Sequence, residues 1–413
     1  MIFTKKFENG LRVIVNKMEG FMSVSCGILV KTGSSNENDK ENGISHFIEH
    51  TMFKGTKKRT AFQISESIDN IGGQINAFTS KEVTCYYTKS TSDKIEDALE
   101  VLSDIFFNSK FDEEELEKEK GVVIEEIKMS EDTPEDILLD LLAESYYGKN
   151  GLGKTILGPE ENIRNFTRQD LLDYMDKYYT ADNVVISISG GVNEKEIFSL
   201  IENYFANKFA KSKSAEQLNL KADGVKNTFR QKKIEQAHIG ISFPAFPASD
   251  ERAERLNIAN TILGGGMSSR LFQKVREELG LAYSVYSYPS LYKNSGVLEI
   301  YAGVNVASRD LAVEAILGVV KDFAENGITE EEFNRGKVQI KSSFVFGNES
   351  TATQMLLYGK YLLLRDKVFN VEEKMKLYDD ITLSEVNAVI KEIFGNNDIS
   401  VACVSPEDSP IKI

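Results

Sequence analysis

The sequence predicts an α+β protein of two homologous domains, each a mainly antiparallel sheet packed against helices. Three observations lead to this class. A length of 413 residues exceeds what one ordinary hydrophobic core organises, and 41% hydrophobic residues suit a folded chain. Strand-like runs occur in groups rather than in strict alternation with helical runs. Similar patterns then recur in both halves of the chain.

The first half supplies most of the predicted strands. The N-terminal stretch "MIFTKKFENGLRVIVNK" is typical of strand, turn and strand, and "NVVISISGG" predicts a late strand followed by a helix. Between them, strands are expected in "VSCGILVKTG", "GGQINAFTS" and "EVTCYYTKS". Helical periodicity runs over residues 43–53, 61–71, 93–107 and 112–129.

A repeat relates the two halves. The segments that begin at Leu102 and Val319 each show an amphipathic helix, a turn, an acidic helix start and a long helix. Each half also ends in a short apolar strand. Duplication of one domain is the simplest explanation, and convergence on a common pattern is the alternative. We predict a first domain at residues 1–207, a polar, lysine-rich linker at 208–228 and a second domain at 229–413.

Composition narrows the classes of function. The net charge of −15 is opposite to that of a typical nucleic-acid-binding protein, so nucleic acid is not an expected partner. The N-terminus lacks the apolar segment of a secretion signal, and no run approaches the roughly 20 apolar residues of a membrane-spanning helix. Cys26, Cys85 and Cys403 are far apart and odd in number, which argues against a disulfide framework. These features predict a cytoplasmic protein with no membrane partner.

The stretch "GISHFIEHTMFKGT" holds two of the chain's three histidines. On an α-helix, His46 and His50 lie on one face at positions i and i+4, and Glu49 lies beside them. Two neutral imidazoles can hold one zinc ion, and Glu49 can accept a proton from a water molecule whose pKa the metal lowers to about 7. The pattern is HxxEH, the inverse of the HExxH zinc motif. A chance placement of two structural histidines is the alternative, and the scarcity of histidine in the chain argues against it.

Two histidines need a third protein ligand, and spacing leaves its identity open. Glu119 and Glu126 share a face of the long acidic helix but lie two turns apart, about 10 Å along the axis at 1.5 Å per residue. One would bind the metal, and the other would support the site or contact the substrate. Spacing does not exclude Glu125 either. His238 lies in a strand of the second half and is expected to be an ordinary strand histidine.

Several stretches of the chain together resemble a known family. They are similar to motifs of the pitrilysin/insulinase-type zinc metallopeptidases, and most similar to those of bacterial relatives of the β subunit of the mitochondrial processing peptidase. The resemblance covers nearly the whole chain. The stretches are "GISHFIEHTMFKGT", "INAFTS", "VVIEEI" and "GGGMSSRLFQKVREELGLAYSVYS".

The resemblance implies roles for residues of the first half. In the family, the third ligand lies 76 residues beyond the second histidine, which implies Glu126 here. Glu119 matches a further carboxylate that supports activity, and Glu49 matches the general base. The strand "INAFTS" matches one that pairs with the peptide substrate, which implies backbone contacts at Asn76, Ala77 and Phe78.

The resemblance also implies roles in the second half. Arg276 and Tyr283 match positions that contact the substrate and stabilise the tetrahedral intermediate, as cationic and phenolic donors can. The second half has no HxxEH pattern, so one copy of the repeat is expected to keep the metal and the other to shape the substrate chamber. "GGGMSS" lacks the GK[ST] ending of a phosphate loop and predicts a tight turn before a helix.

The expected function is therefore that of a zinc-dependent endopeptidase with one Zn²⁺ per chain, acting on peptides or on unfolded, presequence-like segments. Some relatives carry four such domains in one chain, so a two-domain chain is expected to form a homodimer. Arg276 and Tyr283 of one protomer would then serve the zinc site of the other. The alternatives are a non-catalytic peptide-binding or scaffolding subunit, and a catalytic subunit that needs a different partner chain.

Overall fold

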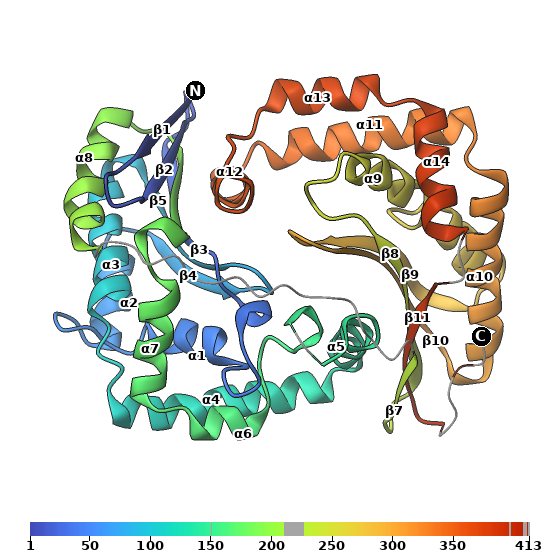
Figure 1. Ribbon diagram of the computed structural model, residues 1–413, viewed down its shortest axis with the longest axis horizontal. Coiled ribbons are helices and arrows are strands. Elements are labelled where there is room, and N and C mark those ends of the chain that lie inside the picture. The colour runs from blue at the N-terminus through green and yellow to red at the C-terminus, as the bar shows by residue number, and fades with distance from the viewer. Residues whose placement is uncertain (150, 210–226, 396–397, 408–410, 412–413) are drawn as a thin grey trace. The chain divides into compact units, whose positions relative to one another are not determined.

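Two β-sheets organise the protein, one formed by each half of the chain (Figure 1). The structure is a computed structural model that describes residues 1–149, 151–209, 227–395, 398–407 and 411. Backbone contacts divide it into two compact units, each with its own sheet and hydrophobic core. The predicted α+β class is therefore confirmed. Of the described residues, unit 1 holds 1–128, 154–209 and 346–369, and unit 2 holds 129–149, 151–153, 227–345, 370–395, 398–407 and 411.

The sheet of unit 1 has six strands in the order β1-β2-β6-β3-β5-β4. Neighbouring strands are antiparallel except β2 and β6, which run parallel. The central strands β3 and β6, which combine apolar residues with small serines and glycines, are buried almost throughout, whereas β4 lies at an edge beside β5. The strands are β1 (Ile2–Lys6), β2 (Arg12–Lys17), β3 (Ser23–Val30), β4 (Gln74–Thr79), β5 (Thr84–Thr91) and β6 (Val184–Gly190).

Helices cover the sheet of unit 1 and share its core. The helices α2 and α7 begin with capping boxes at Thr60 and Thr167. In each box the threonine hydroxyl accepts a hydrogen bond from the backbone amide three residues on, and the side chain of that residue accepts one from the threonine amide. Apolar faces of α1 and α3 pack beside β5. The helices are α1 (Ile44–Thr51), α2 (Ala61–Asp69), α3 (Ile95–Asn108), most of α4 (Glu113–Asp132), α6 (Glu160–Asn165), α7 (Arg168–Tyr178), α8 (Glu194–Tyr204) and α12 (Thr351–Arg365).

The sheet of unit 2 repeats the same pairing with five strands in the order β7-β11-β8-β10-β9. The pair β7 and β11 is parallel and the other pairs are antiparallel, so each strand matches one of unit 1. This shared topology supports duplication of one domain. The strands are β7 (Asn227–Gln231), β8 (Gln236–Ala245), β9 (Ala282–Leu291), β10 (Gly296–Asn305) and β11 (Ser400–Ser405). The helices are α5 (Pro134–Tyr147), α9 (Arg252–Leu263), the π-helix η6 (Phe272–Glu278), α10 (Arg309–Asn326), most of α11 (Glu330–Gly347), α13 (Val371–Asp380) and α14 (Leu383–Phe394).

Two helices pack in the unit whose sheet is formed by the other half of the chain. The helix α5 comes from the first half but packs in unit 2 against β8 and β11, where Leu138 and Leu142 meet Ala402 and Val404. This exchange makes both units discontinuous in sequence.

The second helix of this kind, α12, comes from the second half but packs in unit 1 against β3 and β6. The hydroxyls of Thr351 and Ser25 lie 2.9 Å apart, and the side chain of Asn16 donates to that of Gln354 at 2.7 Å. Sequence periodicity gave each domain one continuous stretch, and those boundaries stay a prediction. Of the predicted linker, residues 210–226 lie outside the described residues.

Two expectations from composition can be compared with the structure. Cys26, Cys85 and Cys403 are all buried free thiols. Among the described residues, the helices are too short or too polar to cross a membrane.

Candidate metal centre

A short helix, α1, carries the HxxEH pattern, and its first turn is fixed by a buried carboxylate. Gly43 precedes the helix with φ +99°, and a Cβ there would meet the Leu157 carbonyl oxygen at 2.7 Å, so glycine suits this position on both counts. The side chain of Glu37 accepts from the amides of Gly43 (2.8 Å) and Ser45 (2.9 Å). These bonds satisfy amides that a helix start leaves without partners.

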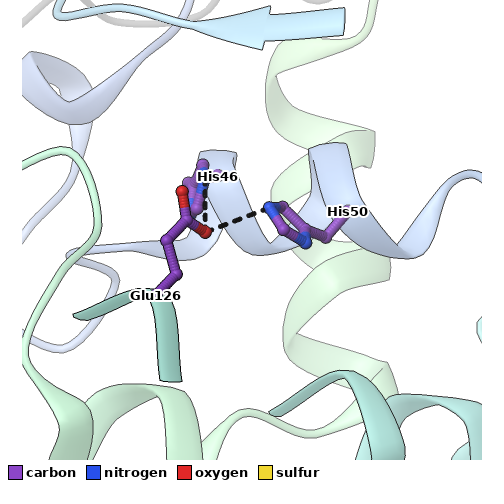
Figure 2. Close-up of side chains that lie close together, drawn as sticks. All are labelled: His46, His50 and Glu126. Carbon is purple, nitrogen blue, oxygen red and sulfur yellow. Dashed lines mark ion pairs between the residues drawn. The ribbon is translucent and has the colours of Figure 1, made fainter. Parts of the chain in front are cut away.

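His46, His50 and Glu126 converge on one point (Figure 2). The first two project from α1, one turn apart, and Glu126 projects from α4. Oε2 of Glu126 lies 3.6 Å from Nε2 of His46 and 3.4 Å from Nε2 of His50. One candidate ligand atom from each residue lies within 4.8 Å of the others. The spacing of donors is that of atoms around one common ion.

The donor set fits a zinc ion. Oε2 of Glu126 is buried, yet within the described part of the chain it has no hydrogen-bond partner of good geometry. A buried oxygen of this kind is costly unless something binds it. Two imidazole nitrogens and one carboxylate oxygen match the three protein ligands of a catalytic zinc site, in which the fourth position stays open.

Burial and neighbouring charges shift the pKa values of the two histidines in opposite directions. Burial, with the positive charge of His50, lowers the pKa of His46 to about 4, so its imidazole is neutral near pH 7. Burial also acts to lower the pKa of His50, but the neighbouring carboxylates of Glu119 and Glu126 outweigh burial and raise it to about 9. Two carboxylates thus surround one imidazole, and this local negative charge favours a cation at the site.

Glu119 lies behind His50. It is not part of the candidate metal group, which consists of His46, His50 and Glu126. Its Oε1 is 2.9 Å from Nδ1 of His50, and its Oε2 is 2.7 Å from the Nζ of Lys54. Burial raises the pKa of Glu119, but the bonds from His50 and Lys54 outweigh it and hold that pKa below the usual value. A carboxylate on Nδ1 leaves Nε2 of His50 as the nitrogen that faces Glu126. The neighbouring Glu125 points away and pairs with Lys128 at 2.6 Å on the exposed face of α4.

Glu49 lies on the same helix, and its carboxylate is held by a threonine. The hydroxyl of Thr79 donates to Oε2 of Glu49 at 2.6 Å. Burial raises the pKa of Glu49 above the ordinary glutamate value, while this hydrogen bond and the charge of His50 oppose the rise. A carboxylate with a raised pKa beside a metal group is suited to exchange protons near neutral pH.

The three residues matched to substrate contacts lie in the edge strand β4. The amide of Ala77 donates to the side-chain oxygen of Asn76 at 2.8 Å. The ring of Phe78 lies under the Nζ of Lys360, 5.2 Å from its centroid. The side of β4 away from β5 has no strand partner among the described strands.

Arg276 and Tyr283 belong to unit 2, where they contact each other. The guanidinium of Arg276 lies 5.2 Å from the ring centroid of Tyr283, and the tyrosine is 75% exposed. Arg276 projects from η6, and Tyr283 from the start of the edge strand β9. The glycine-rich stretch before η6 forms the predicted turn. His238 is a strand residue, with Nδ1 2.9 Å from the hydroxyl of Tyr301.

A cavity of about 820 Å³ in unit 2 contains none of the metal group. It is lined by η6 and α10, with Arg270, Leu279 and Leu311 among its walls. The donor atoms, rather than the size of a cavity, therefore identify the candidate centre.

Three residues around α1 were not singled out from sequence. They are Glu37, Lys54 and Thr79, whose contacts fix the helix start, Glu119 and Glu49. Thr79 lies inside the stretch "INAFTS", and Lys54 lies four residues beyond His50, but no spacing rule assigns either a contact.

Comparisons with known proteins identify the family of the chain. Residues 12–160 match the family model described as insulinase, peptidase family M16, and residues 165–340 match that of the peptidase M16 inactive domain. The chain is 43% identical over 399 residues to the uncharacterized zinc protease YmxG of Bacillus subtilis, covering 97% of both proteins. It is 38% identical over 404 residues to an uncharacterized zinc protease of Rickettsia felis, covering 98% of this chain and 97% of that protein.

Solved structures share the fold. A protease from Helicobacter pylori superposes with a TM-score of 0.92 at 23% identity, covering 98% of this chain and 99% of that one. A peptidase M16 inactive domain from Pseudomonas fluorescens gives a TM-score of 0.92 at 19% identity over the full length of both chains. The matches to the two family models, together with the 43% identity to YmxG over 97% of both proteins, show that the chain belongs to the insulinase family of peptidases, family M16.

Proposed function

We propose that this protein is a zinc-dependent endopeptidase that hydrolyses peptides or unfolded, presequence-like segments. The observation that carries the proposal is the convergence of His46, His50 and Glu126, in which a buried carboxylate oxygen faces two imidazole nitrogens. Membership of a peptidase family and relatives named zinc proteases support it.

His46, His50 and Glu126 would hold the zinc ion. A zinc ion there supplies a Lewis acid for the scissile carbonyl and lowers the pKa of a water molecule. Glu49, one residue before His50, takes a proton from the attacking water and passes it to the leaving amine. Its raised pKa suits both steps, because the group must gain and then lose a proton.

The substrate backbone is proposed to add to the edge strand β4. An extended peptide would pair with the open side of the strand at Asn76, Ala77 and Phe78. The Ala77 amide, which donates to the Asn76 side chain, would turn to the peptide. Arg276 and Tyr283 would supply a cation and a hydroxyl to the oxyanion of the tetrahedral intermediate.

Glu119 is proposed to support activity through His50 rather than by binding the metal. Its two oxygens are occupied by Nδ1 of His50 and the Nζ of Lys54. The active form is proposed to be a homodimer in which Arg276 and Tyr283 of one protomer serve the zinc site of the other, a proposal that rests on the resemblance to four-domain relatives.

A peptide-library digest read by mass spectrometry tests the activity. The purified, zinc-loaded chain is incubated with peptides of diverse sequence, and Glu49→Gln is the matched control. We expect internal cleavage by the wild type. We expect a loss of at least about 10²-fold in Glu49→Gln, because the general base is removed, while zinc stays bound.

Two other results would overturn the proposal in different ways. Undiminished cleavage by Glu49→Gln would exclude Glu49 as the base. A wild-type chain that holds zinc but cleaves no peptide would point to a peptide-binding or scaffolding subunit, and cleavage only after addition of a different chain would point to a heterodimer.

A further inference from the structure

The hydroxyl of Thr79 contacts the carboxylate of Glu49 at 2.6 Å. Thr79 is the last residue of the edge strand β4, whereas Glu49 lies in the last turn of α1. The contact therefore joins the strand proposed to receive the substrate to the helix that carries the proposed base. The helix and the strand also pack against each other.

The backbone around Thr79 is fixed on both sides. Thr79 pairs with Thr84 of β5, and the amide of Ser80 donates to the carbonyl of Val83 at 2.9 Å, which closes the turn between the strands. The Ser80 carbonyl in turn accepts from the amide of Ser34 at 3.3 Å. Threonine is branched at Cβ and restricted about χ1, so its hydroxyl has few alternative positions.

The carboxylate of Glu49 is engaged through one oxygen. Oε2 accepts from Thr79, and Oε1 has no hydrogen bond to any other described residue. A half-buried carboxylate held at one oxygen keeps the other in a defined direction, and a base reacts efficiently when its atom is held within reach of the proton that it takes.

We propose that Thr79 is a positioning residue that holds Oε2 of Glu49 and thereby presents Oε1 to the attacking water. Because Thr79 belongs to β4, one strand would set both the path of the peptide backbone and the direction of the base. The inference rests on the proposed endopeptidase function.

The test compares Thr79→Val with Thr79→Ser. Valine keeps the shape and removes the donor, and serine keeps the donor. The probe is an internally quenched peptide built on a bond that the wild type cleaves in the library digest. We expect Thr79→Val to lower kcat by about 10- to 100-fold with KM within about twofold, because a small displacement of a catalytic group has an effect of this size. Thr79→Ser should recover most of kcat, and all variants should hold as much zinc as the wild type.

Thr88→Val is the matched control. Thr88 lies in β5, and its buried hydroxyl has no hydrogen-bond partner among the described residues. The Thr88→Val variant should keep the wild-type kcat and KM. If Thr79→Val does not fold, Thr79→Ala and Thr79→Ser replace the pair, and serine should exceed alanine in kcat by at least about tenfold.

The outcomes separate this inference from the proposed function. A wild type that cleaves no peptide overturns both. An active wild type with an unchanged kcat in Thr79→Val overturns the positioning role alone. A change in Thr79→Val that is confined to KM would indicate that Thr79 contacts the substrate, and it would also overturn the positioning role.

Discussion

Lys54 stands at the outer end of a series of contacts that runs through Glu119 to His50. The lysine neutralises a nearly buried carboxylate, and each oxygen of that carboxylate has its own partner. This arrangement holds the His50 ring in one orientation. A substitution of Lys54 should therefore change the affinity for a metal ion, although Lys54 is not a proposed ligand.

We expect Lys54→Met to weaken zinc binding by about 10- to 100-fold, the range typical for loss of a partner behind a metal ligand. Competition with a chromophoric chelator measures the affinity, and the visible spectrum of the Co²⁺ form reports the geometry of the site. Lys58→Met is the control, since Lys58 pairs with Glu100 at a largely exposed position. Equal affinities in both variants would show that Lys54 does not support His50.

At this scale the sequence predicted the residues that follow a spacing rule. His46, Glu49 and His50 share a helix face, and that relation follows from helix geometry alone. The choice of Glu126 over Glu119 and Glu125 could not be made from spacing, because the answer depends on how α4 lies against α1. The contact of Thr79 with Glu49 spans thirty residues and depends on a strand end meeting a helix, which no local pattern encodes.

Among the elements, α12 depends on a glycine for its close packing on the sheet of unit 1. A Cβ at Gly359 would lie 2.6 Å from Cδ1 of Leu29 and 2.9 Å from Cβ of Ser187. In α4, by contrast, a Cβ at Gly121 would meet no atom within 4 Å.

Alanine at these two positions should therefore have opposite effects. We expect Gly359→Ala to lower the free energy of unfolding by about 1–3 kcal/mol through overpacking, although alanine favours a helix. Gly121→Ala should raise it by about 1 kcal/mol. Urea denaturation measures both. Stabilisation by Gly359→Ala would mean that α12 does not pack closely on β3 and β6.

Arg270 joins three elements of unit 2. Its guanidinium donates to Glu332 of α11 through Nε and Nη2, both at 2.8 Å, to Asp322 of α10 at 3.1 Å and to the carbonyl of Gly327 at 2.8 Å. The hydrogen bonds from Arg270, which outweigh the opposing effect of burial, lower the pKa of Glu332 to about 2.

The lowered pKa of Glu332 predicts a pH-dependent contribution to stability. Because the folded pKa lies below the unfolded value, the contribution is complete above about pH 4.5 and is lost as the pH falls toward 2. Arg270→Met should lower the free energy of unfolding by about 1–3 kcal/mol near pH 6, because the substitution removes hydrogen bonds between charged groups. The loss should be smaller at pH 3, because the contribution of Glu332 to stability is already reduced there. Melting temperatures across this range measure the effect, with Lys321→Met as a surface-pair control. A difference that does not depend on pH would exclude Glu332 as the partner responsible.

The elements themselves could largely be predicted from sequence. The run "RVIVNK" coincides with β2, and the predicted helix at 61–71 contains α2 (Ala61–Asp69). What periodicity could not predict is the exchange of α5 and α12 between the units. An amphipathic pattern predicts that one face of a helix is buried, but it does not predict which sheet that face packs against.

For the whole molecule, the two sheets share one pairing pattern, yet the HxxEH pattern occurs once. The helix α9, which follows β8 as α1 follows β3, carries neither histidine. The duplication predicted from the repeat is thus visible in topology, and a second chain is the proposed source of further residues at the metal site.

A mixing experiment tests that arrangement. Arg276→Ala and Glu49→Gln should each be inactive alone. Mixed under conditions of verified subunit exchange, they should recover activity, because some dimers then combine an intact zinc site with an intact Arg276. A mixture that stays inactive would exclude a site shared between protomers.

The central claim is that His46, His50 and Glu126 hold a zinc ion. The measurement that tests it most directly is the zinc retained per chain, after loading and desalting, by the wild type, Glu126→Gln and Glu125→Gln. The two glutamates are adjacent in α4, but only Glu126 faces the histidines, while Glu125 faces Lys128. We predict one zinc ion per chain in the wild type and in Glu125→Gln, and a small fraction of one in Glu126→Gln. Full retention by Glu126→Gln, or none by the wild type, would contradict the claim.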